Sequence, residues 1–184
     1  MDSKIYRLLR GTLLTFASSA AIALSAQVAI PLPFTPVPIT LQTLVVLLSG
    51  ALLGSRLGPL SVIVYIGLGM TGIPVFASGG AGLARLLGPT GGYLVGFAAA
   101  SFVAGFLFEN GFGKTLFGRT LAMLAASVLI YAFGLARLAS FTGWDSVLSL
   151  GLYPFIAGDM LKIGLLTLLL PATQAVVQIR QKSL

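Results

Sequence analysis

The chain has no cysteine and no histidine among its 184 residues, and it has only four acidic residues. Without cysteine it can form no disulfide and offers no thiol nucleophile, and without histidine it lacks the commonest ligand of zinc and haem. So few carboxylates also leave little from which to build a metal centre or a paired acid–base site. We therefore expect no metal, no cofactor and no enzymatic activity.

Charge is scarce as well. Charged residues make up 8% of the chain and hydrophobic residues 57%, whereas soluble domains average about 25% charged residues. Several apolar runs approach the ~20 residues that a helix needs to cross the hydrocarbon core of a membrane. The composition predicts an all-α integral membrane protein in which residues 1–184 form a single bundle of helices.

The apolar runs and the turn residues between them predict six transmembrane helices. The first run follows a basic lead and also resembles a cleaved signal peptide, but we interpret it as a retained span. The predicted spans are residues 8–29, 39–54, 59–73, 93–108, 119–138 and 153–171.

The basic residues predict the orientation. The net charge is +7, but the bases are spread over connectors with no basic face interleaved with aromatics, so we expect no nucleic-acid partner. Lys and Arg accumulate on cytoplasmic loops, and one side of the predicted bundle receives most of them. Both termini are therefore predicted to be cytoplasmic. The bases on that side are Lys4, Arg7, Arg10, Arg56, Lys114, Arg119, Arg180 and Lys182, against Arg85 and Arg137 on the outer side.

The last span carries an acid and a base three residues apart, Asp159 and Lys162. This spacing places both on one face of a helix. A charge at the centre of a bilayer costs roughly 2.5–3.5 kcal/mol on insertion scales, so such residues usually pair or serve a functional site. A mutually satisfied structural pair is the alternative, and we favour a role in ligand binding.

Two outer connectors carry further candidates. The glycine-rich segment 78–93 permits tight turns and close approach to a ligand, and its Arg85 suits a carboxylate; anchoring to a lipid headgroup is an equally good interpretation. The proline-rich segment 30–38 is stiffened by repeated X-Pro steps. We interpret it as a lid over a pocket, with a plain interfacial connector as the alternative.

Three further patterns have simpler interpretations. Ala17 and Ala21, followed by Ser25, place small residues on one face of the first span, which allows close packing within the bundle or against another membrane protein. Residues 67–72 match G-x-G-x-x-G and residues 113–115 match the end of a P-loop, but neither has the soluble α/β surroundings that nucleotide binding requires. We interpret them as a helix end and a cytoplasmic turn.

Three separated segments give the chain a resemblance to the BioY family, and together with their spacing they cover almost its whole length. They are AQVAIPLPFTPVPITLQT (26–43), GPTGGY (88–93) and PFIAGDMLK (154–162).

The resemblance implies a biotin-specific substrate-binding (S) component of an energy-coupling factor (ECF) transporter. Such a subunit would lie in the plasma membrane with a biotin site open to the outside. Its partners would be a transmembrane coupling protein and two ATPases, and Ala17 and Ala21 would form the docking face. Asp159 and Lys162 would bind biotin with Arg85, and whether Arg85 or Lys162 takes the carboxylate stays open. Further substrate-binding candidates in the matching segments are Gln42, Gly91 and Tyr93.

Two other functions compete with this one. A self-sufficient secondary transporter for a small carboxylate-bearing vitamin should show inverted repeats and broken helices, and we find no convincing internal repeat. An intramembrane enzyme would have to work with Asp159 and Lys162, and no second acid is placed beside them. We expect a binding subunit that takes its energy from a partner.

Overall fold

The computed structural model describes the backbone of residues 3–182 and the side chains of residues 5–170. Lys4, Arg180 and Lys182, which contribute to the predicted orientation, lie outside the described side chains. Helices dominate, and the only strands in the described part are β1 (Ala29–Ile30) and β2 (Ile39–Thr40), which pair antiparallel. The α-helices are α1 (Ser3–Gln27), α2 (Gln42–Met70), α3 (Leu83–Leu87), α4 (Gly91–Glu109), α5 (Leu116–Thr142), α6 (Val147–Gly151) and α7 (Tyr153–Lys182), with 3₁₀ turns at Ala77–Gly79 and Phe112–Lys114.

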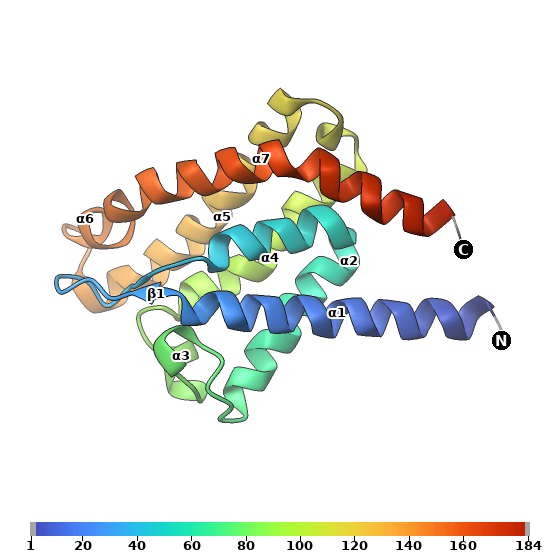
Figure 1. The fold of residues 1–184 in the computed structure, drawn as a ribbon. Coiled ribbons are helices and arrows are strands. Elements are labelled where there is room, and N and C mark those ends of the chain that lie inside the picture. Colours follow the sequence, from blue (N-terminus) through green and yellow to red (C-terminus); the bar gives the residue numbers. More distant parts are fainter. Residues whose placement is uncertain (1–2, 183–184) are drawn as a thin grey trace.

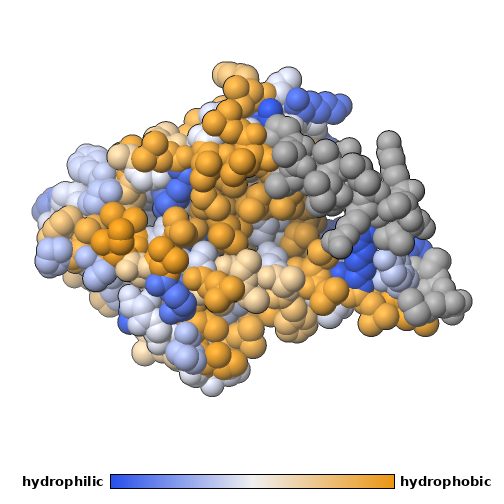
Figure 2. Space-filling model, viewed as in Figure 1, coloured by the Kyte–Doolittle hydropathy of each residue, from blue (hydrophilic) through white to orange (hydrophobic). Residues whose placement is uncertain are grey.

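Five stretches of the described chain are long and apolar enough to cross a membrane: Ile5–Gln27, Gln42–Met70, Gly91–Glu109, Leu116–Thr142 and Val147–Leu170. Many large apolar side chains on the surfaces of these helices are exposed, and Phe117 and Leu161 are more than three quarters exposed. Figure 2 shows apolar residues over much of the visible face. Surface of this kind belongs in lipid, in agreement with an all-helical integral membrane protein.

Residues predicted as two separate spans, 39–54 and 59–73, lie in the single element α2. The element is not one straight helix, because Gly54 has non-helical angles of φ 81° and ψ −178°. A Cβ atom built on Gly58 would lie only 2.8 Å from the Cα of Gly50, whereas eight residues of straight helix span about 12 Å. The chain therefore turns back at Gly54, and the two arms of α2 meet at this bend and diverge from it (Figure 1).

The reversal is held by Glu109 at the end of α4. Its carboxylate accepts hydrogen bonds from the Ser55 backbone nitrogen (2.9 Å) and the Ser55 hydroxyl (2.7 Å). These bonds satisfy a backbone donor that the start of a helical arm would otherwise leave unpaired. Glu109 thus has a structural partner in Ser55.

Both ends of α5 follow capping rules, which explains why this helix is longer than the predicted span 119–138. The hydroxyl of Thr115 accepts from the Gly118 backbone nitrogen at 3.0 Å, as an N-cap residue does. Gly143, with φ 79°, ends the helix in a conformation that glycine adopts freely.

The last apolar stretch of the described chain ends at Leu170, next to the predicted end of the span at residue 171. The helix α7 itself continues beyond this stretch to Lys182.

The helices pack so that α4 lies between α2 and α5, while α1 packs on α2 and α7 contacts α2, α5 and α6. In Figure 1, α1 begins and α7 ends at the same end of the molecule. The opposite end carries β1, α3 and α6.

Candidate substrate-binding site

A cavity opens between the helices at the end that carries the short elements. It encloses about 730 Å³ of empty space, counting its open mouth. Its lining combines apolar and aromatic side chains with a set of polar ones. The apolar members are Val37, Pro38, Phe76, Ala77, Leu94, Phe97, Ile130 and Phe155; the polar members are Thr40, Gln42, Thr43, Arg85, Thr90, Tyr93, Tyr131, Asp159 and Lys162.

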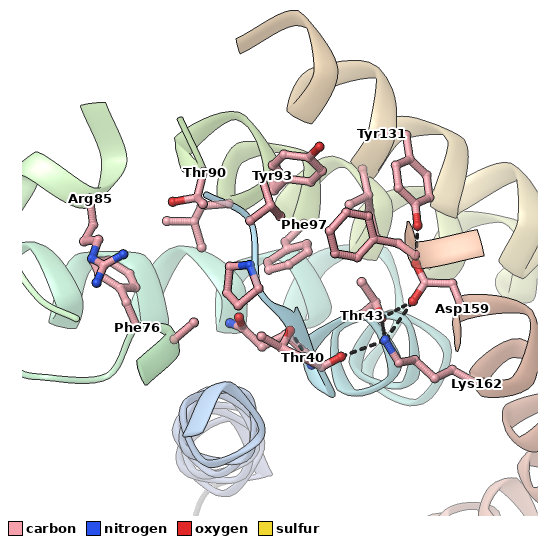
Figure 3. A pocket seen from close by; sticks show the side chains of 17 residues that line it. Thr40, Thr43, Phe76, Arg85, Thr90, Tyr93, Phe97, Tyr131, Asp159 and Lys162 are labelled. Carbon is pink, nitrogen blue, oxygen red and sulfur yellow. Dashed lines mark hydrogen bonds and ion pairs between the residues drawn. The ribbon is translucent and has the colours of Figure 1, made fainter. Parts of the chain in front are cut away.

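Asp159 and Lys162 form an ion pair in the first turns of α7, with 2.7 Å between Lys162 Nζ and Asp159 Oδ1. Their side chains are only 8% and 13% exposed. The i, i+3 spacing does place both on one helix face, and that face looks into the cavity (Figure 3).

The ammonium group of Lys162 has a full set of partners within the protein. Besides Asp159, it donates to the Thr40 backbone oxygen at 2.7 Å and to Thr43 Oγ1 at 3.0 Å. An ammonium group has three protons to donate. A ligand acceptor could therefore bind Lys162 only by replacing or sharing one of these bonds.

Asp159 keeps capacity for a further donor. Its Oδ1 accepts from Lys162 and from the Thr43 hydroxyl at 3.1 Å, while its Oδ2 accepts from the Tyr131 hydroxyl at 2.6 Å. A carboxylate offers about four lone-pair positions, so Oδ2 can accept one more hydrogen bond. The site thus presents a buried, negatively charged acceptor whose orientation is fixed by three neighbouring side chains.

Arg85 lies on α3 at the other end of the cavity, well separated from the charged pair in Figure 3. It is exposed, and its guanidinium makes no hydrogen bond or ion pair with any residue that the structure describes. The lining therefore carries two bases and one acid, and the unpaired positive charge is at the Arg85 end. An anionic group of a ligand would be attracted to this end.

Of the other residues predicted from the sequence, two line the cavity and one does not. Gln42 and Tyr93 line the cavity, but each also has a partner outside it: Gln42 Nε2 donates to the Tyr65 hydroxyl, and the Tyr93 hydroxyl donates to the Gly151 carbonyl, both at 2.8 Å. Gly91 is not among the lining residues. A Cβ atom there would lie 1.7 Å from the Leu86 carbonyl oxygen, so this glycine lets α3 approach the start of α4.

Sequence reasoning did not single out Tyr131, Thr40 or Thr43 as site residues. Tyr131 gave a usable signal, because a tyrosine within an apolar span needs a partner for its hydroxyl when buried. Thr40 and Thr43 stand directly behind the proline-rich segment, and Thr40 contributes its backbone oxygen, which no sequence pattern can reveal.

The proline-rich segment is the loop of the β1–β2 hairpin, and it forms one wall of the cavity through Val37 and Pro38. Its Thr35 is buried, and the Thr35 hydroxyl donates to the Leu150 carbonyl of α6 at 2.8 Å. The segment is thus fixed to α6 by a contact across 115 positions of sequence.

Ala17 and Ala21 lie on α1, away from the cavity. Both are exposed, whereas Ser19, Ile22 and Ala26 form the buried side of this helix. The two alanines therefore face outward from the bundle, toward lipid or another protein. Ser25, predicted on the same face, is buried instead.

A membrane helix bundle around one mostly apolar cavity, with a few buried polar groups, is the architecture of a protein that binds a small molecule within the membrane. The family model of the BioY family matches residues 1–179. The chain belongs to the BioY family.

Curated relatives agree. The chain is 43% identical over 143 residues to a probable biotin transporter BioY of Pyrococcus horikoshii, covering 78% of this chain and 83% of the relative. It is 42% identical over 148 residues to a biotin transporter BioY of Thermotoga maritima, covering 79% and 84%. These relatives are transporters, so the expectation that the chain is not an enzyme is confirmed.

A solved structure shares the fold. The crystal structure of the S-component for biotin from an ECF-type ABC transporter superposes with a TM-score of 0.78 at 27% sequence identity. The match covers 98% of this chain and 95% of that one.

Proposed function

We propose that this chain binds biotin in the described cavity and is the S component of an ECF-type transporter. The observation that carries the proposal is the arrangement of polar groups at the two ends of one apolar cavity: a buried carboxylate with a spare acceptor position at Asp159, and an unpaired guanidinium at Arg85. Family membership and the structural match to a biotin S-component support it.

Biotin has the complementary chemistry. Its ureido head offers two N–H donors and a carbonyl acceptor, its ring and chain are apolar, and it ends in a carboxylate. In this proposal a ureido N–H binds Asp159 Oδ2, the apolar part packs on Phe76 and Phe97, and the carboxylate lies near Arg85. A monoanionic ligand would also neutralise the one excess positive charge of the lining.

The hydrogen-bond partners favour Arg85 over Lys162 for the carboxylate. All three donors of Lys162 already have partners in the protein, so a carboxylate there would displace a good hydrogen bond. Arg85 would gain a partner without losing one. A planar guanidinium also suits a carboxylate geometrically.

We further propose that the two arms of α2 cross the membrane separately, giving six crossings with both termini in the cytoplasm. An even number of crossings fits the position of both chain ends at one end of the bundle (Figure 1). The excess of Lys and Arg predicts that this end is cytoplasmic. The cavity then opens to the outside of the plasma membrane.

The chain would take its energy from a coupling protein and two ATPases. Its own sequence has no P-loop and no soluble nucleotide-binding domain. The exposed Ala17 and Ala21 would allow a helix of the coupling protein to approach α1 closely.

Uptake of labelled biotin by cells that lack their own biotin transport tests this function. Cells that produce the chain together with an ECF module should accumulate biotin, and a catalytically inactive ATPase should abolish the uptake. Undiminished uptake with the inactive ATPase would favour a self-sufficient secondary transporter. Failure of the purified chain to bind biotin would exclude the proposed function.

The absence of cysteine provides a clean test of orientation. Trp144, on the loop before α6, and Lys114, at the opposite end, are both exposed. A membrane-impermeant thiol reagent added to intact cells should label Trp144→Cys and should label Lys114→Cys only after the membrane is permeabilised. The reverse pattern would contradict the proposed topology.

A further inference from the structure

The carboxamide of Gln27, the last residue of α1, reaches a segment about fifty residues away in sequence. Its Nε2 donates to the Ala23 backbone oxygen within α1 at 3.2 Å and to the backbone oxygens of Val75 and Phe76, both at 3.3 Å. Its Oε1 accepts from the Gly79 backbone nitrogen at 3.2 Å. Because the carbonyls face the nitrogen and the amide faces the oxygen, only one orientation of the carboxamide satisfies all these partners.

The hydrogen bonds of Gln27 with Val75, Phe76 and Gly79 fall on the α2–α3 loop (residues 71–82). This loop forms a wall of the cavity through Phe76 and Ala77. The loop is compact: the Phe76 nitrogen donates to the Gly80 carbonyl at 2.9 Å, and Ser78 has the left-handed angle φ 58°. A left-handed non-glycine residue carries a conformational cost that neighbouring contacts must offset. Gln27 supplies such contacts from outside the loop.

The loop also positions two parts of the proposed site. The ring of Phe76 is 3% exposed and packs edge-on against Tyr65, with 5.5 Å between ring centroids. A Cβ atom on Gly80 would lie 2.6 Å from Arg85 Nε, so the loop backbone runs directly beside the guanidinium. Movement of the loop would therefore displace an aromatic wall and the surroundings of Arg85 together.

We infer that Gln27 is a positioning residue: it holds the α2–α3 loop against the cavity and thereby slows release of the ligand. Gln27 is not a lining residue, so it acts through the loop. The inference rests on the proposed function, since it concerns release of the ligand that the cavity binds.

Two substitutions separate hydrogen bonding from side-chain bulk. Gln27→Met keeps the length and suits a helix but makes none of the three bonds to the loop. Gln27→Glu keeps the shape and the acceptor for Gly79 but turns a carboxylate oxygen toward two carbonyls. Asn110→Leu is the control, because this exposed amide donates to Phe106 within its own helix (2.7 Å) and lies away from the cavity.

The first measurement is the dissociation rate of biotin from the purified full chain in lipid nanodiscs. We expect Gln27→Met to speed release about three- to tenfold, because this factor corresponds to the net contribution of one neutral hydrogen bond. Gln27→Glu should speed it more, and Asn110→Leu should leave it within twofold of the wild type. A normal rate for Gln27→Met would overturn the inference, because this variant keeps the length of the side chain but makes none of the bonds to the loop.

The second measurement is hydrogen–deuterium exchange of residues 71–82 in the ligand-free protein, which does not depend on biotin. Both Gln27 variants should exchange faster in this loop than the wild type and the control. Unchanged exchange would overturn the inference even if release were faster. Faster exchange with unchanged release would show that the loop does not limit release. If the wild type itself failed to bind biotin, the proposed function would fall, and the exchange data would still decide whether Gln27 holds the loop.

Discussion

Replacement of Asp159 by Asn removes the charge of the proposed ureido acceptor with almost no change of shape. The new carboxamide would keep its oxygen toward Lys162 and Thr43, which both need an acceptor there. Its NH₂ group would then occupy the place of Oδ2, beside the Tyr131 hydroxyl. A ligand N–H that meets a carboxylate in the wild type would meet a donor in the variant.

The expected loss follows from that exchange. A hydrogen bond to a charged group contributes about 1.5–3 kcal/mol, so the Kd for biotin should rise about ten- to 150-fold. The fold should suffer less, because Lys162 keeps three acceptors in the variant. We expect the melting temperature of the ligand-free protein to change little.

Isothermal titration of the purified chain with biotin measures the effect directly. Asp145→Asn is the matched control: this acid is exposed on the loop before α6, and no partner is found for it among the described residues. It should bind like the wild type. An Asp159→Asn protein that binds biotin normally but melts much earlier would show that the charged pair serves the fold rather than the ligand.

Three other predictions follow from the same geometry. Arg85→Met should weaken binding of biotin about three- to tenfold, a modest effect because the group is exposed, but should leave binding of biotin methyl ester unchanged; equal losses for both ligands would remove Arg85 from the carboxylate. Thr35→Val should speed biotin release, because it deletes the hydrogen bond from the proline-rich segment to α6 without changing the shape of the side chain. The control Thr120→Val affects a hydrogen bond within α5 and should leave the release rate unchanged. Equal release rates for the two variants would refute the lid. Ala17→Trp and Ala21→Trp should abolish ATP-dependent uptake yet leave binding by the purified chain near normal, and uptake that survives both would place the docking face elsewhere.

Asp159 and Lys162 could be predicted as site residues from the sequence, because an acid and a base within an apolar run have few possible explanations. Arg85 could be proposed because it stands against the charge bias of its side of the bundle. The lid interpretation of residues 30–38 stays a prediction, and the structure shows that Val37 and Pro38 of this segment line the cavity. In each case the argument depended on residue type and position along the chain.

Other parts depend on contacts between distant segments. The predicted spans 39–54 and 59–73 place a break close to Gly54, but the close approach of Gly50 and Gly58 could not be predicted from them. Tyr131 becomes a site residue only because α5 lies beside α7. Gly91 belongs to a matching segment, yet the structure uses its missing side chain for helix packing. Sequence patterns do not encode such distances.

The central claim is that this chain alone captures biotin, and the stoichiometry of binding tests it most directly. The purified chain in nanodiscs, without ATP and without partner proteins, should bind biotin at one molecule per chain in a calorimetric titration. It should not respond to riboflavin or thiamine under the same conditions. No heat with biotin, or a clear titration with another vitamin instead, would contradict the account.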